Sequence, residues 1–373
     1  MLPLTWLEID LEAIRANVRR MAALTGTRVM AIVKANAYGH GAPAVAQAAA
    51  EAGAAWLGVA RADEGLALRA AGLGLPILVL GHTPPALAAE ALSQDLTLTV
   101  VEAEAGQAYA AAAQALGRPA RVHLKVDTGM GRLGVRPEAA PELYRALRAL
   151  PGLEVEGVFT HFARADEALA ETDGLTAARQ LARFTEVLQA LEAPPALRHA
   201  ANSAAALTLP GARLDFVRMG IALYGLHPSP DVPCPPGFRP VLTWKAQVAQ
   251  VKSLPAGHGI SYGHYYVTQA PETVAIVTVG YADGYRRALH INEVLIHGQR
   301  APVRGRVCMD QIIVGVTHLP GVRPGDEAVL LGEQAGPDGR VEALTADDLA
   351  EKWKTINYDV TSGILPRVAR LSR

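Results

Sequence analysis

The sequence predicts an α/β protein: a (β/α)8 TIM-type barrel followed by a mostly antiparallel β domain. Short β-type runs alternate with helical segments through the first two-thirds of the 373 residues. After a proline-rich stretch, further β-type runs are joined by glycine-bearing turns with few helices between them. Apolar residues make up 50% of the chain, so a large core and two domains are available.

The barrel is predicted from eight strand-and-helix pairs. Parallel strands need crossover helices, so the alternation indicates a parallel sheet, and eight units favour a closed barrel over an open doubly wound sheet. Expected helical segments include Asp63–Ala71, Pro137–Leu150 and Gly174–Leu191. The eight expected strands are Val29–Val33, Ala55–Val59, Ile77–Leu80, Leu96–Val100, Val122–Val126, Val155–Thr160, Leu197–Ala201 and Phe216–Arg218.

Six prolines between Pro228 and Pro240 predict a linker before the second domain. We place the barrel at residues 9–230 and the β domain at residues 1–8 and 231–373, with the strand-like Thr5–Ile9 pairing with the second domain. One helix is expected at Thr345–Lys354, with Thr345 as its N-cap. The expected strands of this domain are Val241–Val251, Thr273–Val279, Glu293–Ile296, Gln311–Val316 and Glu327–Leu331.

Composition narrows the function class. The formal net charge of -1 and the pI of about 6.8 give no electrostatic case for nucleic acid or an anionic membrane. The two cysteines are too few for a disulfide framework and, with no secretory signal visible, suit the cytoplasm. The Ala-rich stretch from Ala42 to Ala60 contains Gln47 and Glu51, so we interpret it as a helix followed by a strand rather than a membrane span. The histidines and carboxylates do not show the paired spacing of metal ligands, so no metal is expected.

Polar residues lie at or just beyond the ends of five predicted strands. In a (β/α)8 barrel the chemistry lies at the carboxyl ends of the strands, so these residues are expected at one mouth. They are Lys34, Lys125 with Asp127, His161, Asn202 with Ser203, and Arg218 with Gly220.

Lys34 is the candidate nucleophile. Partial burial at a strand end lowers the pKa of a lysine and favours the free amine that a Schiff base needs. The alternative is a lysine whose charge simply reaches solvent from a strand end. Ser203 and Gly220 stand where barrels commonly bind phosphate, although Ser203 could be an ordinary N-cap. Arg218 could donate a hydrogen bond to a pyridine nitrogen or pair with Asp215.

At these residues the chain resembles bacterial alanine racemases, which are fold-type III pyridoxal 5′-phosphate enzymes. The resemblance runs nearly end to end and rests on nine motifs in the family's order. They are Val33–Gly41, Lys125–Gly134, Thr160–Ala163, Ala201–Ala204, Val217–Gly225, Ser261–Gly263, Val279–Gly284, Gly305–Gln311 and Ile356–Val360.

The resemblance implies a role for each matched residue. Lys34 would bind pyridoxal 5′-phosphate covalently and act as one acid/base, and Tyr262 of a partner subunit would act as the other. Arg132, the Met309 backbone N–H and Tyr281 would face the substrate, and Lys125 would be carbamylated. The remaining cofactor residues would be Tyr38, His161, Asn202, Ser203, Arg218, Gly220, Ile221 and Tyr358.

Each assignment has a plainer alternative. Tyr262 could be a turn tyrosine, Tyr281 and Tyr358 could be packing aromatics, Lys125 could pair with Asp127 or another carboxylate, and Met309 could be a core residue.

The resemblance implies a homodimeric cytoplasmic racemase of alanine that supplies D-alanine for peptidoglycan. Two acid/bases on opposite faces suit inversion of an α-carbon, and an arginine at the pyridine nitrogen suits racemisation better than transamination or decarboxylation. The rivals are a non-catalytic pyridoxal-phosphate carrier, a racemase of serine or larger amino acids, and a barrel decarboxylase of basic amino acids.

Overall fold

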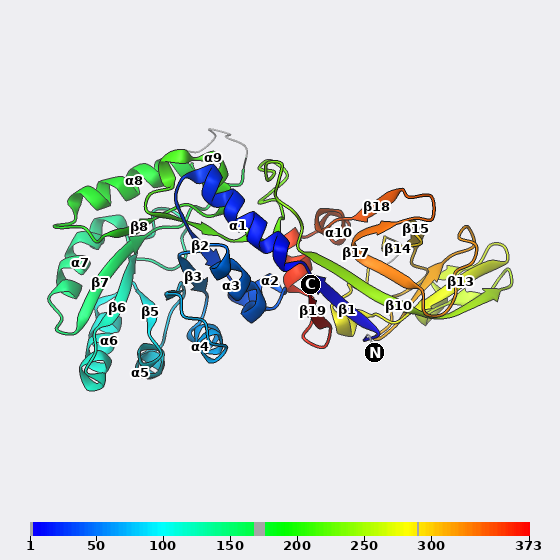
Figure 1. The fold of residues 1–373 in the computed structure, drawn as a ribbon, viewed down its shortest axis with the longest axis horizontal. Helices are drawn as coiled ribbons and strands as arrows, with labels where there is room; N and C mark the ends of the chain where they lie inside the picture. The colour runs from blue at the N-terminus through cyan, green and yellow to red at the C-terminus, as the bar shows by residue number, and fades with distance from the viewer. Residues whose placement is uncertain (1–2, 168–175, 289–290) are drawn as a thin grey trace. The chain divides into compact units, whose positions relative to one another are not determined.

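The computed structural model describes residues 3–167, 176–288 and 291–373, which leaves Gly174 and Leu175 of one expected helix outside the described residues. The chain divides into two compact units (Figure 1). The barrel unit comprises residues 12–37 and 42–239, and the β unit comprises residues 1–11, 38–41 and 240–373. We describe each unit by itself.

The barrel unit contains an eight-stranded sheet in the order β8-β7-β6-β5-β4-β3-β2-β9, with every pair parallel. Backbone hydrogen bonds from Asp215 N to Arg198 O (3.0 Å) and from Arg218 N to Ala201 O (2.9 Å) join its two ends and nearly close the barrel. All eight predicted strands are confirmed. They are β2 Arg28–Ile32, β3 Trp56–Val59, β4 Ile77–Val79, β5 Leu96–Val100, β6 Ala120–Lys125, β7 Leu153–Phe159, β8 Leu197–His199 and β9 Phe216–Met219.

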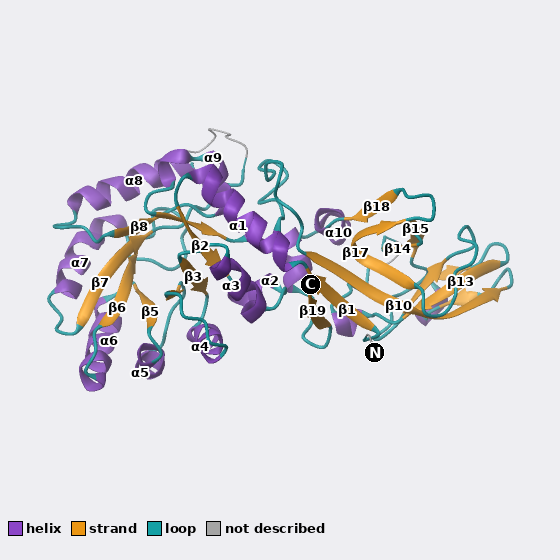
Figure 2. Ribbon diagram, viewed as in Figure 1, coloured by secondary structure: helices purple, strands orange, loops and turns teal. Residues whose placement is uncertain are grey.

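Helices flank these strands (Figure 2), and β3, β4 and β5 are buried at every residue, as expected of parallel strands covered on both faces. The Ala-rich stretch forms a ten-residue helix before β3, as predicted. Within the described ranges, no helix has the length and hydropathy needed to cross a bilayer. The helices are α1 Leu11–Thr25, α2 Lys34–Tyr38, α3 Ala42–Glu51, α4 Ala62–Ala70, α5 Pro85–Ser93, α6 Ala103–Leu116, α7 Ala140–Arg148, α8 Ala177–Ala190 and α9 Ser203–Thr208.

The β unit is built on one long strand, β10 (Leu242–Leu254), which pairs antiparallel with β1, β13 and β17. β1 (Thr5–Ile9) therefore joins this unit as predicted, and its parallel pairing with β19 (Ala369–Ser372) makes the sheet mostly rather than wholly antiparallel. The other strands are β11 Gly259–Ile260, β12 Tyr266–Val267, β13 Glu272–Val277, β14 Glu293–Ile296, β15 Gln299–Pro302, β16 Ile312–Gly315, β17 Glu327–Ala335 and β18 Val341–Leu344.

Several short elements of the β unit were not predicted. β15 has the sequence QRAP and β18 the sequence VEAL, and neither carries the β-branched or aromatic pattern that identifies a strand. Their strand conformation comes from pairing with β14 and β17. Short 3-10 segments occur in both units: Pro137–Ala139, Pro210–Ala212 and Ile221–Tyr224 in the barrel unit, and Tyr262–His264 and Tyr281–Asp283 in the β unit.

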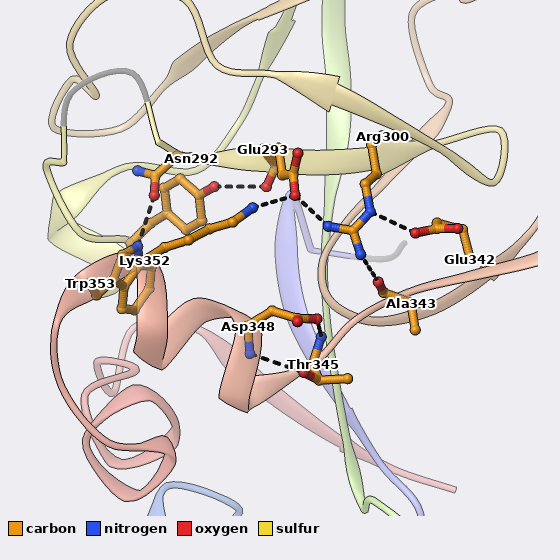
Figure 3. Close-up of polar contacts among 10 residues, drawn as sticks. Asn292, Glu293, Arg300, Glu342, Ala343, Thr345, Asp348, Lys352 and Trp353 are labelled. Atoms are coloured by element: carbon orange, nitrogen blue, oxygen red, sulfur yellow. Dashed lines mark hydrogen bonds and ion pairs between the residues drawn. The ribbon is translucent and has the colours of Figure 1, made fainter. Parts of the chain in front are cut away.

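Helix α10 (Ala346–Trp353) confirms the predicted helix, and Thr345 caps it by accepting a hydrogen bond from Asp348 N (3.0 Å). Its last turn is tied to the sheet through Glu293, which pairs with both Lys352 and Arg300 (Figure 3). Trp353 Nε1 also donates to Asn292 Oδ1 (2.8 Å). These contacts fix α10 against β14. α11 (Asn357–Ser362), which was not predicted, follows it.

Candidate active site

The barrel unit gathers the predicted strand-end residues at one edge of its sheet, because the carboxyl ends of parallel strands face the same way. Lys34 follows β2, Lys125 ends β6, His161 follows β7, Ser203 follows β8, and Arg218 lies in β9. Electrostatic interactions connect Lys34, Lys125, His161 and Arg218, so their charges lie near one another.

The charges at this mouth are mostly positive. Burial, then the nearby Arg132 and Arg218, lower the pKa of Lys34, while Glu64 opposes them. A lowered pKa leaves more of the lysine as free amine near neutral pH, which is the form that attacks a carbonyl carbon. The same excess of positive charge favours an anionic ligand.

Lys34 opens a left-handed turn that the sequence did not predict. Ala35, Asn36, Ala37 and Tyr38 all have φ between 52° and 54°, although none is glycine. The turn is held locally: Ala35 N donates to Glu64 Oε1 (2.6 Å), and Ala42 N donates to Asn36 Oδ1 (2.9 Å). Since each such residue costs roughly 1–2 kcal/mol, the surrounding contacts must outweigh this strain to fix the backbone beside Lys34.

Ala35→Gly is expected to stabilise the protein by about 1 kcal/mol, because glycine adopts a positive φ without strain and the exposed Ala35 methyl contributes little packing. Denaturant unfolding checks the sign. The matched control is Ala23→Gly, at an exposed position in the right-handed helix α1, which should destabilise by about the same amount. A loss of stability in both variants would contradict the interpretation that the backbone at Ala35 is strained.

Lys125 lies at the end of β6 with its side chain buried, and the loop after it is organised by Asp127. Asp127 accepts four backbone hydrogen bonds, from Gly129, Met130, Gly131 and Arg132, at 2.7–3.1 Å. Within the described part of the chain, no carboxylate lies within ion-pair distance of Lys125, so the alternative of a Lys125–Asp127 pair is wrong. Burial, with Arg218 and Arg132 nearby, lowers the pKa of Lys125 to about 8.

Arg218 is 3% exposed and its guanidinium faces main-chain carbonyls and imidazoles. Nη2 donates to Thr160 O (2.7 Å), Ala200 O (2.8 Å) and His161 Nδ1 (3.2 Å), and Nη1 donates to His199 Nδ1 (3.0 Å). The alternative of an Arg218–Asp215 pair is wrong, because Asp215 is engaged by Arg198 (2.9 Å). Burial lowers the pKa of Arg218 to about 9, which still leaves it charged at neutral pH.

Ser203 ties together the loops after β8 and β9. Its Oγ accepts from Gly220 N (2.9 Å) and Ala222 N (3.3 Å) and therefore fixes Gly220 and Ile221 beside it. The N-cap of α9 is not Ser203 but Asn202, whose side chain accepts from Ala205 N (2.9 Å). Ser203 is therefore free of the capping role that was its plainer interpretation.

The β unit holds the remaining predicted residues. The rings of Tyr38 and Tyr358 are 6.1 Å apart, and burial raises the pKa of Tyr38. Tyr281 N donates to Cys308 O (3.1 Å) and Ala282 N to Met309 O (3.0 Å), so Tyr281 and Met309 lie on neighbouring loops. Met309 is 53% exposed, so the alternative of a core residue is wrong.

Tyr262 lies on a strained turn in the same unit, and its side chain is 66% exposed. Ser261 before it has φ of 61°, and its Oγ donates to Arg306 O (2.6 Å). Arg306 in turn stacks on Tyr265, 3.8 Å from the ring centroid. These contacts fix the turn while leaving the Tyr262 ring outside the unit's own core.

Sequence reasoning missed several residues that support the site. Gln180, 1% exposed, accepts from Ala163 N (2.9 Å) and donates to His161 O (3.3 Å), which holds the loop after β7. Glu64 accepts a hydrogen bond from Ala35 N, and His199 accepts one from Arg218. Glu64 follows a predicted strand by only a few residues, which was a usable signal. Gln180 lies inside a helix, and its sequence gave none.

Known proteins resemble both units of the chain. Residues 9–228 match the family model for the N-terminal domain of alanine racemase, and residues 241–372 match that for its C-terminal domain. An alanine racemase of Desulfovibrio desulfuricans is 48% identical over 98% of this chain and 97% of its own length.

Solved structures agree with these matches. Alanine racemase from D-cycloserine-producing Streptomyces lavendulae superposes with a TM-score of 0.92 at 42% identity, over 100% of this chain and 98% of that one. A histidine racemase from Leuconostoc mesenteroides has a TM-score of 0.90 at 30% identity, covering 99% and 98%. With both domains matched in order and the strand-end residues in place, the chain belongs to the alanine racemase family.

Proposed function

We propose that the protein is an alanine racemase that interconverts L- and D-alanine with pyridoxal 5′-phosphate. The observation that carries the proposal is the presence of two basic side chains at the barrel mouth: the amine of Lys34, whose pKa is lowered, and the buried guanidinium of Arg218. A cytoplasmic enzyme of this kind would supply D-alanine for peptidoglycan.

The residues present fit this cofactor. Lys34 supplies the amine that holds its aldehyde carbon, and Ser203 with Gly220 and Ile221 forms a loop pair suited to its phosphate. The Nε of Arg218 has no hydrogen-bond partner among the described residues, which leaves a donor for a ring nitrogen. Tyr38, His161, Asn202 and Tyr358 would complete the binding set. When bound, the cofactor withdraws electrons from the substrate α-carbon.

Arg218 distinguishes racemisation from the rival reactions. A guanidinium donates a hydrogen bond but not a proton, whereas a carboxylic acid at this position would protonate the ring and extend electron delocalisation. Limiting that delocalisation favours return of the proton to the α-carbon. The barrel decarboxylase is therefore the weaker interpretation, and the β unit with its Tyr262 turn weighs against a non-catalytic carrier.

Inversion needs proton transfer on both faces of the α-carbon. Lys34 would serve one face, and Tyr262 of a partner subunit would serve the other. The exposed position of Tyr262 supports this, as does the distribution of exposed large apolar side chains in the described residues. Most of them, including Tyr265, Val267 and Ile291, belong to the β unit, which is typical of an oligomer interface.

Substrate choice would depend on Arg132, Tyr281 and the Met309 backbone N–H. Arg132 is exposed at the mouth, where it can pair with a carboxylate, and Tyr281 would narrow the entrance so that larger side chains clash. The likeness to a histidine racemase shows that this fold also accommodates a larger substrate, so serine and histidine belong in the test.

The test is to incubate the protein and pyridoxal 5′-phosphate with L-alanine in deuterated water. Loss of optical rotation and deuterium at Cα are expected, with slower reaction of L-serine and L-histidine. Retained optical rotation with no deuterium uptake would refute racemisation, and faster turnover of serine or histidine would refute the choice of alanine.

Lys125 is expected to form a carbamate that orients Arg132. Its pKa of about 8 leaves part of the amine unprotonated near neutral pH, and only the free amine reacts with carbon dioxide. Carbamate formation should therefore increase as pH rises through 8. Carbon-13 NMR after exposure to labelled bicarbonate measures it, with Lys125→Gln as the variant that loses the signal and exposed Lys252→Gln as the control that keeps it. A spectrum without a carbamate carbon would contradict the expectation.

A further inference from the structure

A chain of buried polar side chains runs through the barrel unit away from Arg218. Arg218 Nη1 lies 3.0 Å from His199 Nδ1, and His199 Nε2 lies 2.9 Å from His123 Nδ1. His123 Nε2 lies 3.5 Å from Glu156 Oε1, which is an ion-pair distance, and makes no hydrogen bond within the described part of the chain. Both histidines are fully buried, while the Glu156 side chain is 17% exposed. The chain thus connects the buried cation to a carboxylate on another strand.

The chemistry of the end groups sets the direction of every hydrogen bond. An arginine only donates, so His199 Nδ1 must accept and a neutral His199 carries its proton on Nε2. That proton is donated to His123 Nδ1, which places the His123 proton on Nε2, facing Glu156. Burial lowers the pKa of both histidines, and Arg218 adds to this effect for each, while Glu156 opposes it for His123; a lowered pKa favours the neutral form near pH 7. The two hydrogen bonds then each have one donor and one acceptor, and the last N–H of the series faces the Glu156 carboxylate.

The fold places Glu156 for this contact. The register between β6 and β7 shifts so that Val122 pairs with Val155 but His123 pairs with Gly157, which leaves Glu156 as the extra residue of a β-bulge. Bulges re-aim side chains and are frequent beside functional sites. Thr97 Oγ1 donates to Glu156 Oε1 (3.0 Å) and orients the carboxylate.

The ring positions are equally constrained. A Cβ on Gly157 would lie 2.5 Å from His123 Nδ1, so only glycine lets the His123 ring lie against β7. The His199 ring is stacked between Phe159 (4.7 Å) and Phe216 (4.4 Å). These contacts leave neither imidazole room to turn away from its neighbour.

We propose that Glu156 is a positioning residue for the reaction. Through His123 and His199 it supplies the distant countercharge for Arg218 and holds the guanidinium in place. The inference rests on the proposed role of Arg218 toward the cofactor ring. A carboxylate in direct contact would occupy N–H donors of the guanidinium that the ring nitrogen needs. A carboxylate two imidazoles away stabilises the buried positive charge and leaves those donors available.

The test compares wild type with Glu156→Gln by NMR, using protein labelled with nitrogen-15 at histidine and arginine. In wild type, His199 and His123 should both be neutral with the proton on Nε2. In the variant, the signals of His199 and Arg218 should shift as well as those of His123, because loss of the charge changes the polarisation of each link. A purely structural role would move His123 alone, and that result, or a His199 proton on Nδ1, would overturn the proposal.

Kinetics supply the second readout. Glu156→Gln should lower kcat about tenfold with KM for alanine unchanged, the loss typical of removing a group that orients a functional residue by hydrogen bonding. Glu154→Gln, an exposed carboxylate on the same strand, is the control and should match wild type. Unchanged kcat in Glu156→Gln would also overturn the proposal. If the wild type itself fails to racemise alanine, the proposed function is wrong. The NMR shifts would still show whether Glu156 acts on Arg218 through His123 and His199.

Discussion

Lys34→Ala is expected to reduce alanine racemisation by about 10⁴-fold or more, because under the proposed function it removes both the amine that would hold the cofactor and one of the two acid/base groups. Lys125, the other lysine at the mouth, lies on a different strand and would be consumed as a carbamate. The measurement is the initial rate of optical change with saturating cofactor.

The covalent role of Lys34 can be tested apart from turnover. Borohydride treatment of the cofactor-loaded protein should leave the cofactor mass on the peptide that contains Lys34, and no such mass in Lys34→Ala. Exposed Lys252→Ala is the control and should behave as wild type in both assays. Labelling of Lys125 in the wild type would show that the wrong lysine has been assigned.

The barrel was predictable because its strands are short, apolar and buried on both faces. β5 has the sequence LTLTV with every residue buried, and its predicted and observed bounds are the same. The edge of the β unit was less predictable. Arg300 in β15 and Glu342 in β18 belong to strands whose conformation depends on partners distant in sequence and on ion pairs such as the one between them (2.6 Å).

The candidate site was predictable where topology alone brings residues together. Lys34, His161 and Arg218 come from strand ends, and parallel strands place their ends at one edge. The left-handed turn after Lys34 was not predictable, since alanine and asparagine give no sign that φ is positive at four consecutive residues. The position of Glu156 depends on a bulge, which changes which side chains face the barrel interior without changing the apolar pattern.

Tyr262→Phe is expected to slow racemisation by about 10²–10⁴-fold, the contribution of one positioned acid/base group. The effect should differ between the two hands of alanine. The enantiomer whose α-proton Lys34 removes should still exchange that proton with deuterated solvent, whereas the other should exchange slowly. Proton NMR of each enantiomer measures this. Tyr265→Phe, in the same turn, is the control, and equal slowing of exchange in both enantiomers would contradict the two-base assignment.

Mixing the two impaired variants tests whether Tyr262 acts across the proposed dimer. If it serves the partner subunit, a heterodimer of Lys34→Ala and Tyr262→Phe chains has one site with both groups intact and one site with neither. Random exchange at equal concentrations makes half of the dimers mixed. In a two-fold symmetric dimer each chain contributes the same residues to the two sites, so a mixed dimer has one intact site out of two. Activity should therefore recover to about a quarter of wild type. Recovery cannot occur if Tyr262 serves its own chain, since every site would then lack one group. The mixture therefore distinguishes a site shared between subunits from a site within one chain. The activity of each variant measured alone does not make this distinction.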